Sequence, residues 1–287
     1  MTSESLAQGL YLLASPIGHL GDLSPRLKAV LADCDLVAAE DTRRSLKLLN
    51  HLDLKKPLIS YREQNHAVAW PKIENVLAQD GRVALLSDAG APTLADPGVL
   101  LVQAARAKGY KIWPIPGPSA VVTALMASGF WAERFIFGGF LPVKSAERVA
   151  IVKKLDDVGL CVVYFETPHR LLASLKDLAK TLGPRSALLA REMTKVHEEY
   201  LFGELPELLA NVKAKPRQGE ITLVIGPKAK EPKPELDWEP AVADVLEGGD
   251  EMWALKGLAT ELAAMTKKPK KDIYARLLKM SNTKLFD

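Results

Sequence analysis

The sequence lacks the features that mark several large classes of protein. It holds only 2 cysteines among 287 residues, Cys34 and Cys161, far apart and each in apolar surroundings. They are too few for a disulfide scaffold or a cysteine metal site, so we expect two small buried side chains in a reducing compartment. No apolar run approaches the ~20 residues that span a bilayer. Residues 1–8 lack the basic and apolar regions of a secretion signal. We therefore expect a cytoplasmic protein with no membrane part and no metal.

Two common nucleotide-binding patterns are also missing. The segment Ser15–Asp22 contains Gly18 and Gly21, but it has neither the three-glycine dinucleotide fingerprint nor a Walker lysine. A Rossmann dehydrogenase is therefore disfavoured. The net charge of +3 is too small to indicate nucleic acid by itself, and no internal repeat is present.

What the first half of the chain does contain is an alternation of short apolar runs and helix-like stretches. Because strands that alternate with helices pair in parallel, this half predicts a mostly parallel sheet with helices on its faces. The expected strands are Leu10–Ser15, Leu36–Glu40, Pro57–Ser60, Val83–Ser87 and Lys111–Ile115, and the expected helices are Ser24–Asp33, Thr42–Leu52, Ala67–Gln79 and Val99–Lys108. Ser24-Pro25 predicts a helix start and Gly109 a helix stop.

The second half predicts another α/β unit followed by a small helical part. The alternation breaks near Phe137–Pro142, which we interpret as a domain boundary. The next expected elements are the helices Ser145–Leu155, Arg170–Leu182 and Pro206–Val212, the strands Leu160–Phe165, Ser186–Arg191 and Glu220–Ile225, and a turn-rich segment Lys195–Glu204. Prolines mark a linker, and two helices, Trp253–Met265 and Asp272–Met280, end the chain. We expect domains at residues 1–137 and 138–227, a linker at 228–250 and a helical domain at 251–287.

The loop Ser87–Gly98 is the first candidate site. It follows a predicted central strand, at the edge where open α/β sheets bind ligands. Its small residues let a ligand approach the backbone, its prolines fix its path, and its carboxylates accept hydrogen bonds. An ordinary tight turn is the alternative, but twelve residues exceed what a turn requires.

A second loop, Pro114–Ala120, also follows a strand. It brings Ser119 and Ala120 to a helix start, where free N–H groups bind polar ligands. The alternative is that Ser119 serves only as a helix cap. Two such loops at neighbouring strand ends favour a ligand site.

Charged clusters follow strands in both units, which suggests a cleft between them. They contain Glu40, Asp41, Arg43 and Arg44 in one unit, and Glu166, His169, Arg170, Lys195 and Glu198 in the other. Acids at a cleft can accept a proton or hold a ribose, and arginines can contact phosphate. Alternatively, Glu40 and Asp41 only cap a helix, and a lone histidine such as His169 is usually structural.

The tail is divided by charge. Residues 231–251 are acidic, whereas lysines and arginines gather from Lys267 to Lys284. Two short helices with a basic second half are typical of a helix-turn-helix-like contact with RNA or DNA. A solvated pair of basic helices explains the pattern equally well.

Taken together, these motifs resemble the tetrapyrrole (corrin/porphyrin) methylase superfamily. The resemblance runs in order from Leu10 to Gly226 and rests on Ala14–Asp22, Ala39–Arg43, Ser87–Gly98, Pro114–Ala120, Tyr164–Arg170, Lys195–Glu199 and Gly219–Gly226. More narrowly, it is to the members that methylate a cytidine ribose 2′-hydroxyl in 16S ribosomal RNA. The departures are small: His19 stands where the family usually has asparagine, and Ala91-Pro92-Thr93 replaces a typical Thr-Pro-Gly.

The resemblance implies two α/β domains with a cleft that binds S-adenosylmethionine, a small helical C-terminal domain and a homodimer. It also implies a set of cofactor-binding residues: Pro16, Ser87, Asp88, Gly90, Leu94, Ser119, Ala120, Phe165 and Glu220. The expected RNA-binding residues are Arg43, Arg44, His169, Arg170 and Lys195. The expected partner is 16S rRNA within the small ribosomal subunit.

The implied reaction is an in-line transfer of a methyl group to the ribose oxygen. The electrophile arrives activated, so the protein mainly aligns two atoms and needs a base for the hydroxyl proton. Candidate bases are Glu40, Asp41, Glu166 and Glu198, which sequence does not rank. Two rival functions remain: a tetrapyrrole C-methyltransferase of the same fold, and a non-catalytic RNA-binding or ribosome-assembly protein.

Overall fold

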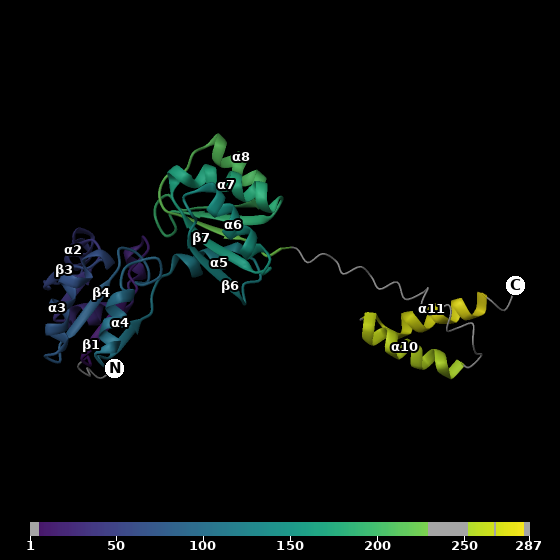
Figure 1. Cartoon of the computed structure of the whole chain (residues 1–287), viewed down its shortest axis with the longest axis horizontal. Helices are drawn as coiled ribbons and strands as arrows, with labels where there is room; N and C mark the ends of the chain where they lie inside the picture. The colour runs from purple at the N-terminus through teal and green to yellow at the C-terminus, as the bar shows by residue number, and fades with distance from the viewer. Residues whose placement is uncertain (1–5, 229–251, 267, 284–287) are drawn as a thin grey trace. The chain divides into compact units, whose positions relative to one another are not determined.

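The computed structural model of the chain describes residues 6–228, 252–266 and 268–283. The chain divides into two compact units, Met1–Lys228 and Ala229–Asp287. The first unit holds two five-stranded sheets, and the second holds a helix pair drawn in yellow-green (Figure 1). Among the described residues, no helix combines the length and the apolarity needed to cross a membrane.

The first sheet is fully parallel, as the sequence predicts. Its strands are β1 (Gly9–Leu13), β2 (Leu36–Ala39), β3 (Leu58–Ser60), β4 (Arg82–Leu86) and β5 (Ile112–Ile115), in the spatial order β3-β2-β4-β1-β5. All four pairings are parallel. Because the inner strands β1 and β4 are parallel neighbours, the loops that leave them lie side by side at the carboxyl edge, where such sheets bind ligands.

Helices cover both faces of this sheet. α1 (Pro25–Asp33) and α2 (Thr42–His51) share a core with one face, and α3 (His66–Leu77) and α4 (Val99–Ala107) share a core with the other. Short 3-10 turns lie at Leu20–Asp22 and Glu63–Asn65. The Ser24 hydroxyl accepts from the Leu27 N–H at 3.1 Å, and Gly109 has the positive φ of a helix stop. Both predicted helix signals are confirmed.

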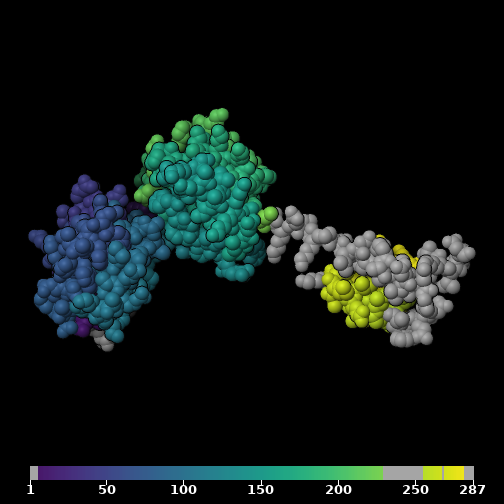
Figure 2. Space-filling model, viewed as in Figure 1, coloured from purple at the N-terminus to yellow at the C-terminus, as the bar shows by residue number. Residues whose placement is uncertain are grey.

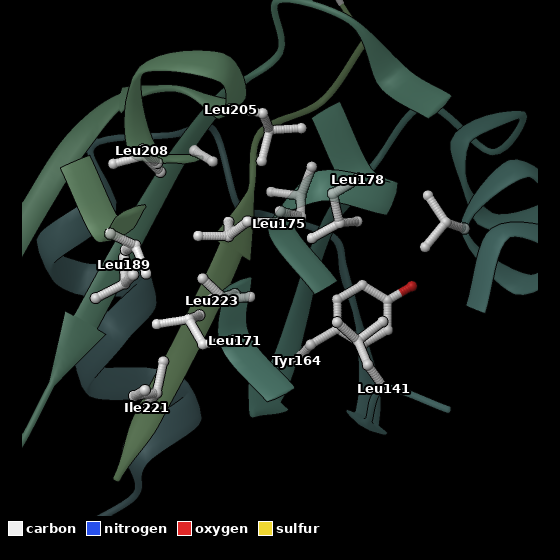
Figure 3. Close-up of a cluster of buried hydrophobic side chains, with 14 of the residues drawn as sticks. Leu141, Tyr164, Leu171, Leu175, Leu178, Leu189, Leu205, Leu208, Ile221 and Leu223 are labelled. Atoms are coloured by element: carbon white, nitrogen blue, oxygen red, sulfur yellow. The ribbon is translucent and has the colours of Figure 1, made fainter. Parts of the chain in front are cut away.

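The second sheet contains both parallel and antiparallel pairings, and more helices pack on one of its faces than on the other. Its strands are β6 (Phe135–Phe140), β7 (Cys161–Glu166), β8 (Ser186–Arg191), β9 (Glu199–Glu204) and β10 (Ile221–Ile225), in the order β6-β7-β10-β8-β9. One face packs on α6 (Ser145–Asp156), α7 (Pro168–Leu182) and α8 (Leu205–Ala214), and the other packs on α5 (Ala120–Ser128). Figure 3 shows the core of the first of these faces, where leucines of the strands and helices gather and the ring of Tyr164 lies beside Leu141. Cys34 and Cys161 are both free and buried.

Two strands of the second sheet correct the sequence interpretation. The segment Phe137–Pro142, which overlaps β6, was expected to be a domain boundary because the alternation of strands and helices breaks there. Gly138 is required here: a Cβ at this position would lie 2.3 Å from the Tyr164 ring. β9 was expected to be a turn-rich segment, but its side chains alternate in exposure and it pairs with β8 as an edge strand.

The two sheets define two lobes, residues 6–119 and 120–228. Because β6 pairs with β7, the boundary expected after residue 137 falls inside a strand of the second sheet. α5 also packs on β8 and β10, so the second lobe starts at this helix. Figure 2 shows the surface of each lobe, the first coloured purple to blue and the second teal to green.

The unit Ala229–Asp287 contains the two helices expected at the end of the chain. α10 (Met252–Thr266) and α11 (Lys270–Thr283) pack through Leu255, Ala259, Leu262, Ile273 and Leu277. The basic side chains of Lys270 and Lys271 are exposed at the start of α11. The linker expected at 228–250 lies almost wholly outside the described residues, as do Lys267, Lys284 and the acidic segment 231–251.

Candidate functional site

The loop after β4 has a constrained backbone and is tied to the loop after β1. Gly90 and Ser15 exchange two backbone hydrogen bonds, of 3.0 Å and 2.9 Å. Gly90 has a φ of 78°, a conformation that favours glycine. Thr93 and Ala95 also have positive φ values, 73° and 65°. The position where the family usually has glycine is thus held by Thr93 in a left-handed conformation, so the unusual residue leaves the turn in place.

This loop forms one wall of a cavity of about 360 Å³. That volume is within the range of small-molecule sites. Both lobes contribute residues, which come from loops at the carboxyl edge of the first sheet, the start of α5 and the ends of strands in the second sheet. The lining is Ile17, Glu40, Arg44, Asp88–Ala91, Leu94, Asp96, Ser119–Val121, Phe140, Phe165–Pro168, Met193 and Gly219–Thr222.

One side of the cavity is apolar and aromatic. Phe140 and Phe165 both line it, with ring centroids 5.6 Å apart in an edge-to-face arrangement. Phe140 and Leu94 are about half exposed, although large apolar side chains are usually buried. Ile17 and Met193 complete this side. The cavity can therefore hold a planar or apolar part of a ligand against these side chains.

The other side carries carboxylates. Glu40, Asp88, Asp96 and Glu220 all line the cavity. Burial raises the pKa of Asp96 to about 7, the neighbouring charge of Glu40 adds to this, and a hydrogen bond from Ser87 opposes it. Burial, and then the charge of Asp88, raise the pKa of Glu40. A cationic ligand would relieve the repulsion within this group.

Two cations partly balance these acids at the margin of the cavity. Arg44 lies 3.6 Å from Asp88, and Lys195 lies 3.1 Å from Glu220. Asp88 also accepts a hydrogen bond from the Asp41 N–H at 3.0 Å. Glu40 and Asp96 have no such ion pair within 4.0 Å among the described residues, so neither carboxylate is matched by a salt bridge.

Known proteins resemble this chain along most of its length. A family model described as Tetrapyrrole (Corrin/Porphyrin) Methylases matches residues 9–209. The ribosomal RNA small subunit methyltransferase I of Mesorhizobium japonicum is 41% identical over 98% of this chain and 95% of its own length. The protein of that name from Synechocystis sp. is 38% identical over 94% and 98%. The chain belongs to the tetrapyrrole methylase family.

Solved structures agree with this assignment at the level of the fold. The methyltransferase CobJ matches with a TM-score of 0.59 and 16% identity, over 79% of this chain and 97% of its own. Diphthine synthase matches with a TM-score of 0.58 and 15% identity, over 76% and 89%. The predicted membership of the tetrapyrrole methylases is confirmed, as is the narrower resemblance to the members named ribosomal RNA small subunit methyltransferase I.

As a member of this family the protein is a methyltransferase that uses S-adenosylmethionine, which confirms the predicted cofactor. The cavity suits that molecule chemically. Its carboxylates match a sulfonium and an ammonium group, and its phenylalanines match an adenine ring. α5 begins without a side-chain cap, which leaves its first N–H groups available for a carboxylate. The alternative role of Ser119 as a side-chain cap is therefore wrong.

Most of the residues expected to bind the cofactor line this cavity. They are Asp88, Gly90, Leu94, Ser119, Ala120, Phe165 and Glu220. Pro16 and Ser87 do not line it, and they contribute instead to a second, adjoining cavity. Ser87 is nearly fully buried, and its hydroxyl lies 2.9 Å from the Gly90 carbonyl oxygen. Ser87 therefore stabilises the conformation of the loop.

Of the four acids expected as bases, Glu40 and Glu166 line the cavity. Glu166, however, already has its hydrogen bonds inside the protein. Oε1 accepts from Arg170 Nε and Nη2 at 2.9 Å and 2.7 Å and from the Thr167 N–H at 2.8 Å, and Oε2 accepts from the Ser174 hydroxyl at 2.5 Å. Its side chain has no exposed surface. These contacts assign Glu166 to the structure of the cavity wall.

The other two acids lie away from the cavity lining. Asp41 caps α2, accepts from the backbone and side chain of Arg43, and has its pKa lowered chiefly by the side-chain hydrogen bond. Glu198 accepts from the Tyr200 hydroxyl at 2.6 Å, which lowers its pKa, and from the Thr194 N–H. Carboxylates with lowered pKa values are weak bases. The capping role weighed for Asp41 matches what the structure shows.

Of the residues expected to bind RNA, two line a cavity and the other three do not. Arg44 lines both cavities and Lys195 lines the second. Arg43 is paired with Asp41 on the surface. Arg170 holds Glu166 and the Leu141 carbonyl, so its guanidinium is occupied inside the protein. His169 is exposed at the start of α7, 3.4 Å from the Thr167 hydroxyl.

Several lining residues were not expected, and Asp96 is the most important. It belongs to the loop that the sequence singled out, but nothing in the sequence distinguishes it from Asp88. Phe140 was hidden because its strand was not recognised. Thr222 and Met193 read as ordinary core residues. Among the described residues no three metal-binding side chains are grouped closely enough to hold a metal ion.

Proposed function

We propose that this protein transfers a methyl group from S-adenosylmethionine to the 2′-hydroxyl of a cytidine ribose in 16S ribosomal RNA. The observation that carries the proposal is the relation to the proteins named ribosomal RNA small subunit methyltransferase I, 38–41% identical over nearly the whole chain. The carboxylates of the cavity support the chemistry, because a hydroxyl must lose its proton as its oxygen is methylated.

Asp96 is the residue that we propose as the base. The bound cofactor supplies a methyl group already activated on a sulfonium. Asp96 lines the cavity, and a base works best when its pKa lies near the working pH; the pKa of Asp96 is raised to about 7. The ribose hydroxyl would pass its proton to Asp96 as its oxygen takes the methyl group that the cofactor would supply. Glu40 beside it keeps Asp96 basic by repulsion between the two carboxylates.

Contacts with the RNA would come from cations around this cavity. Arg44 and Lys195 are the two expected residues placed to do this, and Arg43 and His169 lie further out on the surface. The exposed lysines at the start of α11 give the C-terminal helix pair the basic face that suits RNA, so we retain it as an RNA contact. Phosphate contacts of this kind supply affinity rather than sequence specificity.

Transfer of a labelled methyl group tests the proposal and its rivals together. Purified protein, labelled S-adenosylmethionine and small ribosomal subunits from cells that lack the enzyme should yield label on the ribose of a cytidine. Label on a base would exclude the ribose assignment. Methylation of a tetrapyrrole instead of RNA would favour the same-fold C-methyltransferase. Binding of cofactor and subunits without any transfer would favour the non-catalytic assembly protein.

We also propose a homodimer, on the basis of exposed apolar residues beside α5. Val122 and Met126 lie four residues apart on the outer face of this helix, and Met126 and Trp131 are 81% and 86% exposed. Side chains of this size are rarely left in water as a group, and such patches typically mark interfaces. A second copy of the chain would remove them from water.

The mass of the protein in solution checks the homodimer. Light scattering should give about twice the chain mass of 31.3 kDa. The double variant Met126→Glu, Trp131→Glu should give the monomer mass, because it places two charges in the interface. Val158→Glu, at another exposed apolar residue, should leave the mass unchanged. A wild-type monomer, or a double variant that stays dimeric, would overturn this interface.

A further inference from the structure

A second cavity, of about 260 Å³, adjoins the first. Its walls are the loop after β1, one face of α2, the end of β4 and two residues of the second lobe. The two cavities share Ile17, Arg44, Asp88, Ala89 and Glu220. A molecule bound in one of them is therefore in direct reach of a molecule bound in the other.

The second cavity differs from the first in its charge. Three cations line it, Arg44, Lys47 and Lys195, and Glu40 and Asp96 are not part of its lining. Arg44 and Lys47 are three residues apart on α2, so they project from the same face of the helix. Lys195 comes from the opposite lobe. Three positive side chains from two lobes thus meet around one space.

Lys47 is the cation of this group whose charge is not matched. Arg44 is 3.6 Å from Asp88, and Lys195 is 2.9 Å from Glu192 and 3.1 Å from Glu220. No carboxylate lies within 4.0 Å of the Lys47 ammonium among the residues that the structure describes. The two ion pairs stand at the border with the carboxylate-rich cavity, since Asp88 and Glu220 line both spaces.

We infer that the second cavity binds a phosphodiester of the RNA strand beside the target ribose, with Lys47 as a direct phosphate contact. The inference rests on the proposed function and specifies where its substrate lies. Each ribose in RNA is flanked by phosphates, so an enzyme that methylates a ribose needs an anion site next to its methyl-donor site. The adjoining cavities provide this arrangement: one is acidic and suits the cationic cofactor, and the other is basic and suits the anionic backbone.

The placement of the two ion pairs adds selectivity to this arrangement. Arg44 and Lys195 form ion pairs with Asp88 and Glu220, the two carboxylates nearest the RNA. The phosphate is therefore not repelled by an unpaired carboxylate. Lys47 then supplies the net positive charge that attracts the phosphate. A macrocycle carbon as the methyl acceptor would not require a phosphate site beside the methyl donor.

The salt dependence of RNA binding tests this inference. Lys47→Ala should weaken binding to small-subunit RNA several-fold at physiological salt. It should also reduce the slope of log K against log salt by about 0.7–0.9, the value for one phosphate contact. Lys47→Arg should retain most of the affinity. Lys72→Ala, an exposed lysine of α3 on the opposite face of the sheet, should leave both quantities unchanged. Lys47 is exposed, so the variant is expected to fold normally.

Binding of S-adenosylhomocysteine distinguishes the possible outcomes. Calorimetry should give the same affinity for wild type and Lys47→Ala if the second cavity serves the RNA. Weaker cofactor-product binding in the variant would assign this space to the cofactor and overturn the inference. An unchanged salt slope would overturn it as well. If the wild-type protein methylates no RNA at all, the proposed function fails first, and the phosphate site fails with it.

Discussion

Replacing Asp96 by asparagine should lower methyl transfer at saturating cofactor by at least about 100-fold, the usual effect of losing a general base. The wild-type rate should rise with pH and level off above about 7, as Asp96 loses its proton. In Asp96→Asn that rise should disappear. Initial rates with labelled cofactor, measured between pH 5.5 and 8.5, give both results. Glu198→Gln, at an exposed acid outside the cavity, is the matched control and should retain the wild-type rate. An Asp96→Asn variant with an unchanged rate would remove Asp96 from the chemistry.

Asp96 should also affect stability, in a direction that follows from its pKa. In the folded protein this pKa is about 7, whereas the ordinary value is 3.8. Between these values the folded state holds a proton that the unfolded state has released, so the free energy of unfolding falls as pH rises from about 4 to 7. Asp96→Asn removes this cost. At pH 8 the variant should gain about 1 kcal/mol in free energy of unfolding, after allowance for solvent screening. Its melting temperature should therefore lie about 2–4 °C above that of wild type. The difference should shrink at pH 5.

Glu166→Gln should have the largest effect on stability of the four acids considered as bases. Glu166 is buried and pairs with Arg170, whose side chain is only 18% exposed. Removing the charge leaves a guanidinium without its counter-ion, which typically costs about 3 kcal/mol when a pair is shielded from water. The melting temperature should fall by about 6–12 °C. Thermal unfolding followed by circular dichroism measures this, with Glu198→Gln expected within about 0.5 kcal/mol of wild type.

Activity per folded molecule separates the two possible roles of Glu166. If it only shapes the cavity wall, Glu166→Gln should keep measurable turnover at a temperature where it remains folded, with the wild-type pH profile. A variant that is as stable as wild type but inactive would contradict the structural role. It would instead restore Glu166 as a candidate base.

The strand and helix order of the first lobe was predictable because local patterns agree with the tertiary structure. Ser24-Pro25 and Gly109 mark helix ends through backbone chemistry that does not depend on distant residues. β6 and β9 were missed for a different reason. Gly138 of β6 is there because the Tyr164 ring occupies the space of a side chain, and that contact is not visible in the sequence of the strand itself.

The site was predictable in its loops but not in the roles of its charges. The loop after β4 has an unusual length and composition, and both features can be seen in sequence. Glu166 ends β7 and Asp96 belongs to the loop after β4, yet one is fully hydrogen-bonded and the other is left with a raised pKa. Whether a carboxylate forms an ion pair with an arginine depends on how the following helix is oriented, as the pair of Glu166 with Arg170 on α7 shows. Similarly, Lys47 looks like a solvated helix residue until the loop after β1 is folded beside it.

Mapping of ribose methylation in small-subunit RNA by mass spectrometry tests most directly whether the protein methylates a ribose of this RNA. RNA from cells that lack the protein should lose one ribose-methylated cytidine. The wild-type gene should restore that modification, and Asp96→Asn, expressed at the same level, should not. An identical methylation map with and without the protein, or the loss of a methyl group from a base rather than a ribose, would contradict the proposed reaction.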